Sequence, residues 1–333
     1  MKILYAIQGT GNGHLSRAMD IIPCLQKRGE VDILVSGIQG DLQLPYEVKY
    51  REMGLSFIFG KSGGVDLWKT FTRSNLRKLA GSIYRLPVQD YDIVINDFEP
   101  VSAWACRIKR KPCIALSHQA AVLLKNYPQP EKPDKLGRYI LKNYAPASTV
   151  YGFHFSSIVD TVSTPVIRQQ VRQLEISDKG HYTVYLPSYD DKKLIKKLSV
   201  YTDTKWDIFS KYNKKKMIFG NITIQPINNS LFTASMASAT GILCGAGFET
   251  PAEALYLGKK LLVIPMKNQY EQQLNAAALQ SMNVPVLKNL NRTSEPVISD
   301  WIANGVPLQI HFPDITQQVV DRVILNHAPT AIL

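Results

Sequence analysis

The segment "GILCGAGFETPAEALYLGKKLLVIPMKNQYEQQLNAAAL", residues 241–279, carries the most specific pattern in the chain. It begins with a short apolar run, passes through Gly245 and Gly247 into a stretch of helical composition, and returns to a second apolar run, "KKLLVIP". Short apolar runs separated by helical segments are typical of a parallel sheet covered by helices. The segment therefore predicts an α/β fold in which a glycine turn leads from a strand into a helix.

The predicted helix of this segment has a clear start signal. Thr250 suits the N-cap, Pro251 suits the first helical position, and Glu253 completes the T-x-x-E pattern of a capping box. Gly258 marks the end of the helix. The free N–H groups and the dipole of such an N-terminus favour a bound anion, so a phosphate site is predicted here. The spacing leaves two interpretations of Glu253 open, a helix cap or a ligand-binding carboxylate.

Polar residues also open the helix that follows the second apolar run. Their spacing places several of them on one face, whereas Leu274 and Ala278 face the core. The polar positions are Gln269, Glu271, Gln272 and Asn275. Both helices follow consecutive strands, and ligands of open α/β sheets bind at the carboxyl ends of the strands. The two polar helix starts are therefore expected at one ligand-binding edge.

A second glycine turn, "GTGNGHLSR" at residues 9–17, follows the apolar run "KILYAIQ". The glycines allow a ligand to approach the backbone closely. A dinucleotide-binding G-x-G-x-x-G pattern would require its third glycine at position 14, where His14 stands. The turn therefore argues against a dehydrogenase.

The rest of the chain alternates strands with helices in the same way. A helix is predicted at about 101–109, and the pattern restarts after about residue 180. The other predicted strands are 31–37, 91–97, 111–118, 181–188, 215–224 and 283–289. We therefore predict two α/β halves that face a cleft. Their expected bounds are 1–164, a linker at 165–180, 181–312, and a C-terminal helix within 313–333 that packs back on the first half.

Composition limits the class of protein. The 333 residues are 45% hydrophobic, and no apolar run reaches the ~18 residues that span a bilayer. The four cysteines show no CxxC spacing, which favours free thiols in a reducing compartment. A cytoplasmic protein is expected, with no metal, since neither a DxD motif in a suitable loop nor a His/Cys cluster is found.

The net charge of +12 is most concentrated in residues 107–142. Three interpretations remain open: a solvated surface, a nucleic-acid groove, or a face that meets anionic lipid or a phosphorylated substrate. No nucleic-acid-binding motif accompanies the charge, so nucleic acid is the least favoured partner. Peripheral contact with an anionic membrane is kept as an expectation because Leu123, Leu124, Tyr127 and Tyr139 lie among the cations.

Together, the two glycine turns resemble those of GT-B glycosyltransferases. The segment 241–279 is similar to the donor half of family 28 and related enzymes, which transfer sugars in peptidoglycan and diglyceride synthesis, and "GTGNGHLSRA" is similar to their N-terminal glycine loop. One departure is Ala246, where a second consecutive glycine is common. The resemblance implies two Rossmann-like domains and a nucleotide-sugar donor, with uridine diphosphate as the carrier and no cofactor.

The resemblance also implies roles for individual residues. The diphosphate would meet the N–H groups of residues 245–248, and Glu253 would accept from the ribose hydroxyls. Ile224 and its backbone would lie at the nucleobase, and Glu271 and Gln272 would contact the sugar. The complete set of donor-binding residues implied is Gly11, Asn12, Gly13, Ile224, Gly245, Ala246, Gly247, Phe248, Thr250, Glu253, Glu271, Gln272 and Asn275.

His14 is the candidate base of the reaction. Transfer with inversion needs a group that takes a proton from the attacking hydroxyl, and a histidine at a helix N-terminus favours its neutral form. Asp97, at the end of a predicted strand, is the candidate that orients the imidazole, and Glu99 is a second. Glu99 and His118 are expected on the acceptor side. The alternative to a base is that His14 caps its helix or contacts phosphate.

Two other functions share these features. A nucleotide-sugar 2-epimerase has the same architecture, and a sugar-nucleotide-binding subunit would perform no chemistry. The acceptor, a glycan or a lipid-linked substrate, is not specified by any motif.

Overall fold

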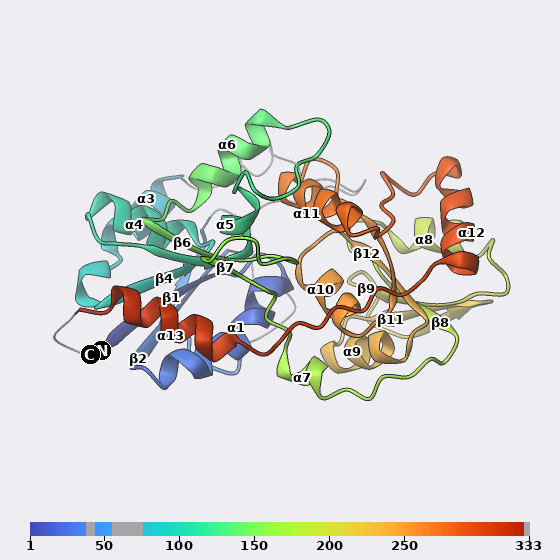
Figure 1. The fold of residues 1–333 in the computed structure, drawn as a ribbon, viewed down its shortest axis with the longest axis horizontal. Coiled ribbons are helices and arrows are strands. Elements are labelled where there is room, and N and C mark those ends of the chain that lie inside the picture. The colour runs from blue at the N-terminus through green and yellow to red at the C-terminus, as the bar shows by residue number, and fades with distance from the viewer. Residues whose placement is uncertain (38–43, 55–75, 330–333) are drawn as a thin grey trace.

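The computed structural model describes residues 1–37, 44–54 and 76–329, and it divides them into two α/β halves that lie side by side (Figure 1). The sheet of the first half has the order β3-β2-β1-β4-β5-β6-β7, and all of its strand pairs are parallel. Its strands are β1 (Lys2–Gln8), β2 (Glu30–Ser36), β3 (Tyr50–Glu52), β4 (Ile93–Asp97), β5 (Ile114–Ser117), β6 (Thr149–Phe153) and β7 (Val162–Ser163). Its helices are α1 (Asn12–Gln26), α3 (Leu76–Arg85), α4 (Pro100–Ile108), α5 (His118–Val122) and α6 (Lys135–Tyr144).

The central strand β1 shows why this half forms three layers. Ile3 and Ile7 pack in a core with Leu15 of α1, whereas Leu4 packs in a second core with Val101 of α4. Successive side chains of a strand point to opposite faces. A strand that is apolar at every position is therefore covered by helices on both faces, as a doubly wound parallel sheet requires.

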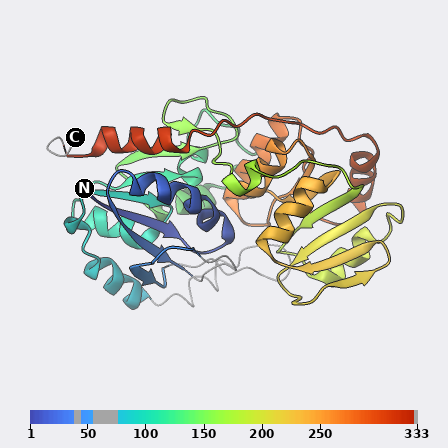
Figure 2. The ribbon, with the colours of Figure 1, turned by 90° about the horizontal axis from the view of Figure 1, so that it is seen from below.

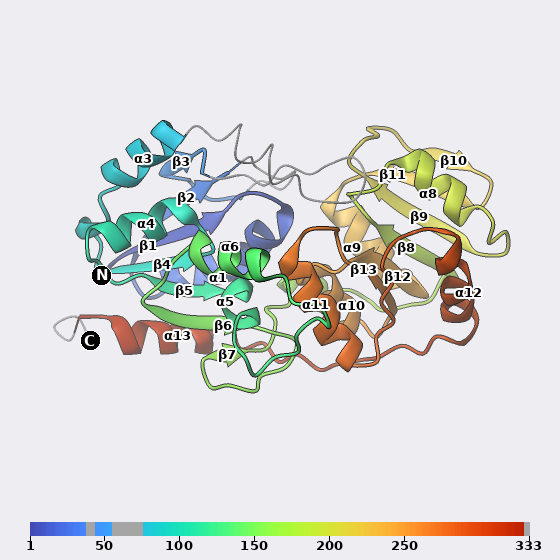
Figure 3. The same ribbon diagram turned by 90° about the horizontal axis from the view of Figure 1, so that it is seen from above.

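The second half contains a six-stranded sheet of order β10-β11-β9-β8-β12-β13. Its strands are β8 (His181–Tyr185), β9 (Lys205–Ser210), β10 (Met217–Phe219), β11 (Ile222–Pro226), β12 (Gly241–Gly245) and β13 (Lys260–Ile264). Its helices are α8 (Asp191–Leu198), α9 (Asn229–Ser238), α10 (Glu249–Tyr256), α11 (Tyr270–Ser281) and α12 (Glu295–Asn304). Figure 3 shows this sheet beside the first one, with α10 and α11 next to the first half.

Two predicted strands of the second half are corrected. The stretch 215–224 is not one strand, because Gly220 adopts a φ of 58° and folds it into the antiparallel pair of β10 and β11. Segment 283–289 contributes only the isolated bridge between Val286 and Val263. Apolar periodicity indicated both segments as strands, but it does not show where a turn reverses the chain.

Two segments connect the halves. The linker contains the short helix α7 (Gln169–Arg172), and the chain after α12 returns to the first half and ends in α13 (Thr316–His327). Figures 1 and 2 show α13 beside α1, where Arg28 donates to Asp321 at 2.7 Å. Tyr151 of β6 also contacts His327, with 3.1 Å between the hydroxyl oxygen and Nε2. The first half is therefore built from both ends of the chain.

No helix among the described residues is long and apolar enough to cross a bilayer.

Candidate active site

Helices from both halves meet end to end between the two sheets. The start of α1 contacts the start of α10, since a Cβ atom added to Gly13 would lie 3.2 Å from Cγ of Glu249. Gly11 precedes α1 with a φ of 91°, a conformation that favours glycine. The first two residues of α5 also face α11, through His118 and Gln119. The carboxyl ends of the two sheets thus share one interface, which contains His14.

His14 and Asp97 form the polar centre of this interface. Nδ1 of His14 is 2.9 Å from Oδ1 of Asp97, and Asp97 is fully buried. An ionised carboxylate only accepts hydrogen bonds, so it holds the proton on Nδ1 and leaves the lone pair on Nε2. Burial raises the pKa of the Asp97 carboxyl, but the charge of Arg17 and the hydrogen bonds from His14 and Arg17 outweigh it and hold this pKa below its usual range. The pair therefore has the tautomer that a general base needs.

The Nε2 atom of His14 faces Gln119 of α5. Nε2 of Gln119 lies 3.2 Å from it, and the side chain of His14 keeps 13% of its surface exposed. Glu271 of α11 interacts with both side chains, and burial raises the pKa of its carboxyl. A polar group of a substrate can therefore reach Nε2 by displacing one amide hydrogen bond.

Arg17, which is 1% exposed, was not predicted as a site residue from the sequence. Its Nη2 donates to both carboxylate oxygens of Asp97, at 2.7 and 2.9 Å, and its Nη1 donates to Glu249 of α10. The signal was present, because Arg17 lies one turn after His14 on the same face of α1. Arg17 thus ties Asp97 of one half to α10 of the other.

Glu249 is the second residue that was missed. Burial raises the pKa of its carboxyl from 4.5 to about 7, against the charge of Arg17. One guanidinium faces two carboxylates here, and two negative charges close together disfavour each other. Asp97 carries the charge, so Glu249 retains a proton up to near neutral pH.

This pKa predicts how stability depends on pH. The native state binds a proton at Glu249 that the unfolded state releases between about pH 4.5 and 7. The stability that the native state gains from this proton is complete below this pH window and is lost as pH rises through it. Since one pKa unit corresponds to about 1.4 kcal/mol, the unfolding free energy of the wild type should fall by on the order of 2 kcal/mol more than that of Glu249→Gln between pH 5 and 7.

Urea unfolding at pH 5, 6 and 7 measures this difference. Glu295→Gln is the matched control, because it changes an exposed carboxylate paired with Lys197 and should retain the wild-type slope. Equal slopes for wild type and Glu249→Gln would show that Arg17 keeps Glu249 ionised over the whole range.

Glu253 lies one turn further along α10, and its capping role is corrected. The helix begins at Glu249 with Phe248 as N-cap, so Thr250 and Pro251 are already inside it, and no side chain caps it. The side chain of Glu253 is instead 3% exposed, and its two oxygens accept from Nε and Nη2 of Arg168 at 2.5 and 2.8 Å. Arg168 lies in the linker and was not found from the sequence, because no local pattern connects it with α10.

Four other candidate residues have buried side chains. Ile224 lies in the middle of β11 with 1% of its surface exposed, in the core of the second half, so the predicted contact would have to come from its backbone. Glu99 is fully buried and caps α4, accepting from Val101 N and Ser102 N at 2.6 Å each. Its place on the acceptor side stays a prediction.

His118 and Asn275 form an internal contact between the halves. Nε2 of His118 is 2.6 Å from Oδ1 of Asn275, both side chains are fully buried, and the imidazole stacks on Phe248 at 3.7 Å. Burial lowers the pKa of His118 to about 3, so the ring is neutral. The two side chains join α5 to α11, and their roles on the acceptor and donor sides stay predictions.

The glycine turn before α10 is open on one side. A Cβ atom at Gly247 would meet no described atom within 4 Å, and one at Gly245 would lie 3.6 Å from Oε1 of Gln272. Gln272 in turn accepts from Met266 N at 2.8 Å. Packing within the described part of the chain therefore does not explain the glycine at 247, whereas a ligand beside the backbone would. No group of His, Cys, Asp or Glu side chains suited to a metal ion occurs in residues 1–37, 44–54 and 76–329.

Several known proteins similar to this chain are glycosyltransferases. The family model described as glycosyl transferase family 1 matches residues 1–307. MurG of Acinetobacter baumannii is similar in structure, with a TM-score of 0.57 at 15% identity, covering 97% of this chain and 98% of that one. UGT89C1 of Arabidopsis thaliana, solved with UDP, has a TM-score of 0.59 at 11% identity, covering 98% and 94%. No curated protein matches the chain in sequence.

These similarities confirm the predicted fold of two Rossmann-like domains. At such low identities the solved structures show the fold, whereas the family model covers both halves of the sequence. The chain therefore belongs to glycosyl transferase family 1 and is a glycosyltransferase of the GT-B fold.

Proposed function

We propose that this glycosyltransferase moves a sugar from a uridine diphosphate donor to an acceptor hydroxyl with inversion at the anomeric carbon. The observation that carries the proposal is the pair of His14 and Asp97 at the interface, with Nε2 available for the proton of the acceptor. Inversion needs one base and no covalent intermediate. A structural relative solved with UDP supports the identity of the carrier.

The donor diphosphate is proposed to lie at the start of α10. Backbone N–H groups of residues 245–248 and the helix dipole stabilise the leaving phosphate, so transfer is expected to proceed in EDTA. The open side of Gly247 is the space for this group. Glu271 and Gln272 are proposed to contact the sugar, and Gly11, Asn12 and Gly13 of the facing turn close over it.

Glu253 is proposed to accept from the two ribose hydroxyls. Both of its oxygens accept from Arg168 in the present structure. The ribose must therefore replace these hydrogen bonds, and donor binding includes a movement of the Arg168 side chain away from the carboxylate.

Incubation with UDP-glucose, UDP-galactose and UDP-N-acetylglucosamine tests the proposal, with hydroxyl acceptors and with EDTA in parallel. Mass spectrometry detects the glycosylated product, and NMR gives its anomeric configuration. An isomerised nucleotide sugar formed without acceptor would instead indicate a 2-epimerase. UDP-sugar binding without any product across a broad acceptor panel would indicate a binding subunit.

A lipid-linked acceptor at the cytoplasmic face of a membrane is proposed as the partner. The structure distributes the basic residues of 107–142 over the end of α4, a loop and α6, so they do not belong to one element. On α6, Leu136 and Tyr139 are 62% and 68% exposed beside the exposed Lys135 and Lys142. This combination suits an anionic membrane surface.

Charge reversal on α6 tests the membrane contact. Each lysine near an anionic surface contributes about 1 kcal/mol, so Lys135→Glu with Lys142→Glu should weaken binding to anionic vesicles at least about 10-fold. Cosedimentation at low and high salt measures the effect. The same change at Lys192 and Lys196 of α8 is the control. Equal binding to neutral and anionic vesicles would contradict the proposal.

A further inference from the structure

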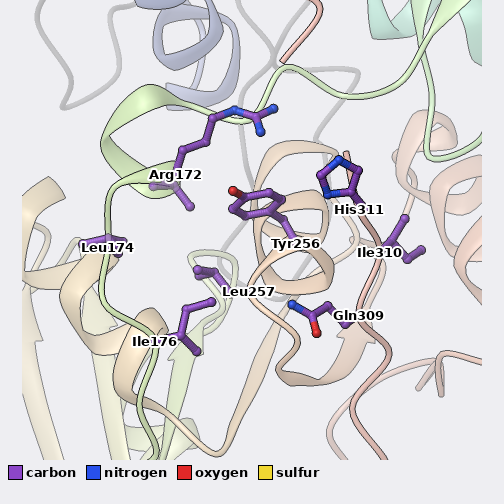
Figure 4. A pocket seen from close by; sticks show the side chains of 9 residues that line it. Arg172, Leu174, Ile176, Tyr256, Leu257, Gln309, Ile310 and His311 are labelled. Atoms are coloured by element: carbon purple, nitrogen blue, oxygen red, sulfur yellow. The ribbon is translucent and has the colours of Figure 1, made fainter. Parts of the chain in front are cut away.

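A cavity of about 350 Å³ lies where the two connections between the halves pass the end of α10. Figure 4 shows its lining side chains, which come from three segments. The linker contributes Arg172, Leu174 and Ile176 among others, α10 and the residue after it contribute Tyr256 and Leu257, and the returning chain contributes residues 309–311. Its volume is at the lower end of the range for small-molecule sites.

One edge of the cavity is cationic and prearranged. Nε of Arg172 donates to Ile167 O at 3.1 Å, and Nη1 donates to Phe312 O at 2.9 Å. The guanidinium lies over the ring of Tyr256, with Cζ 5.1 Å from the ring centroid (Figure 4). Within the described part of the chain its Nη2 group makes no hydrogen bond, so this group can bind a ligand. An arginine held in place in this way suits a carboxylate or a phosphate.

The rest of the lining combines an apolar wall with the polar side chains of Gln309 and His311. Leu174, Ile176, Leu257 and Ile310 form the wall, and none of the nine lining residues is acidic. A ligand that satisfies both parts has an anionic head for Arg172 and a short apolar body for the wall. Its chemical class is a small amphipathic organic anion.

The cavity is connected to the donor helix through α7. Arg168 and Arg172 lie one turn apart, since Arg172 N donates to Arg168 O at 3.0 Å. Arg168 binds Glu253 of α10, and Arg172 stacks on Tyr256, three residues later in the same helix. The returning chain holds the same end of α10, because Ile310 N donates to Leu255 O at 3.0 Å.

We propose that this cavity is a regulatory site for a small amphipathic organic anion, and that its occupation weakens binding of the nucleotide donor. An anion that bridges Arg172 and the wall holds α7 in its present position. The linked Arg168 then stays on Glu253, where the proposed ribose would have to replace it. The coupling is reciprocal, so the nucleotide must also weaken binding of the anion. The effect on nucleotide binding rests on the proposed function, whereas binding of the anion does not.

Calorimetric titration of the full chain with octanoate, without nucleotide, tests the site. Octanol of the same length tests the need for charge, and octyl phosphate distinguishes a phosphate head from a carboxylate. We expect both anions to bind at least 10-fold more tightly than octanol, and Arg172→Met to remove that difference. Ile176→Trp fills the cavity from a position that is 48% exposed and should abolish binding without affecting folding. Arg322→Met is the matched control, since Arg322 also donates to a backbone carbonyl, Asp160 O, outside this cavity.

UDP titration with and without saturating octanoate tests the coupling. We expect UDP affinity to fall about 3- to 10-fold in the wild type and to be unchanged in Ile176→Trp. Equal binding of octanoate and octanol, or octanoate binding that persists in both cavity variants, would overturn the site. Independent binding of both ligands would overturn the coupling alone, and octanoate binding without any UDP binding would contradict the proposed function instead.

Discussion

Replacement of His14 with Ala is expected to lower kcat by about 10²–10⁴ while UDP affinity changes only a few fold. Loss of a general base acts on the chemical step, and such a base contributes about this factor. The geometry supports the assignment, because Asp97 holds Nδ1 at 2.9 Å and leaves Nε2 as the basic atom. Single-turnover transfer measured with saturating UDP-sugar gives the rate of chemistry separately from product release.

His327→Ala is the matched control for this experiment. His327 contacts Tyr151 at the far end of α13 and should leave kcat unchanged. A near wild-type single-turnover rate in His14→Ala would remove His14 from the role of base. Loss of UDP affinity with an unchanged rate would instead indicate that His14 contacts phosphate.

Replacement of Glu253 with Gln is expected to weaken UDP binding by roughly 10- to 150-fold. A carboxylate that accepts from both ribose hydroxyls makes charge-assisted hydrogen bonds of roughly 1.5–3 kcal/mol, and one such contribution is the safer value for the pair. The wild type should discriminate between UDP and 2′-deoxy-UDP in calorimetric titration, and the variant should not.

The ion pair with Arg168 adds a second effect that must be separated from the first. Breaking a buried pair by removing one partner costs about 3–5 kcal/mol of stability, so the melting temperature of Glu253→Gln should also fall. Arg168→Met breaks the same pair and is the matched control, and it should lose stability but keep the discrimination between the two nucleotides. If Glu253→Gln also keeps its affinity and discrimination, the pair is structural and the ribose is held elsewhere.

The fold could be predicted because its signals are local. The strand β1 is apolar at each position from Ile3 to Ile7, which indicates burial on both faces. The contact between His14 and Asp97 could be predicted for a related reason. His14 comes shortly after β1, and Asp97 is the last residue of β4. These two parallel strands are neighbours in the sheet, so their carboxyl ends lie together.

Helix boundaries were less accurate where tertiary contacts decide them. Thr250 has the sequence signature of an N-cap, which predicts a helix that begins at Pro251, yet α10 begins two residues earlier, at Glu249. Phe248 is held by stacking on His118 of the other half, and Glu249 is held by Arg17. With these two contacts between the halves, α10 begins earlier than the local capping box predicts.

The sequence by itself determined the two α/β halves, their glycine turns, and the residues at the carboxyl ends of β1, β4 and β12. Only the tertiary structure decided how the halves meet, through Arg17 with Glu249 and Arg168 with Glu253. The physical reason is the range of the interactions. Apolar periodicity and glycine turns act over a few neighbouring residues, whereas a buried guanidinium needs a carboxylate from any part of the chain. These two partners lie 232 and 85 residues away, and no local pattern encodes such a distance.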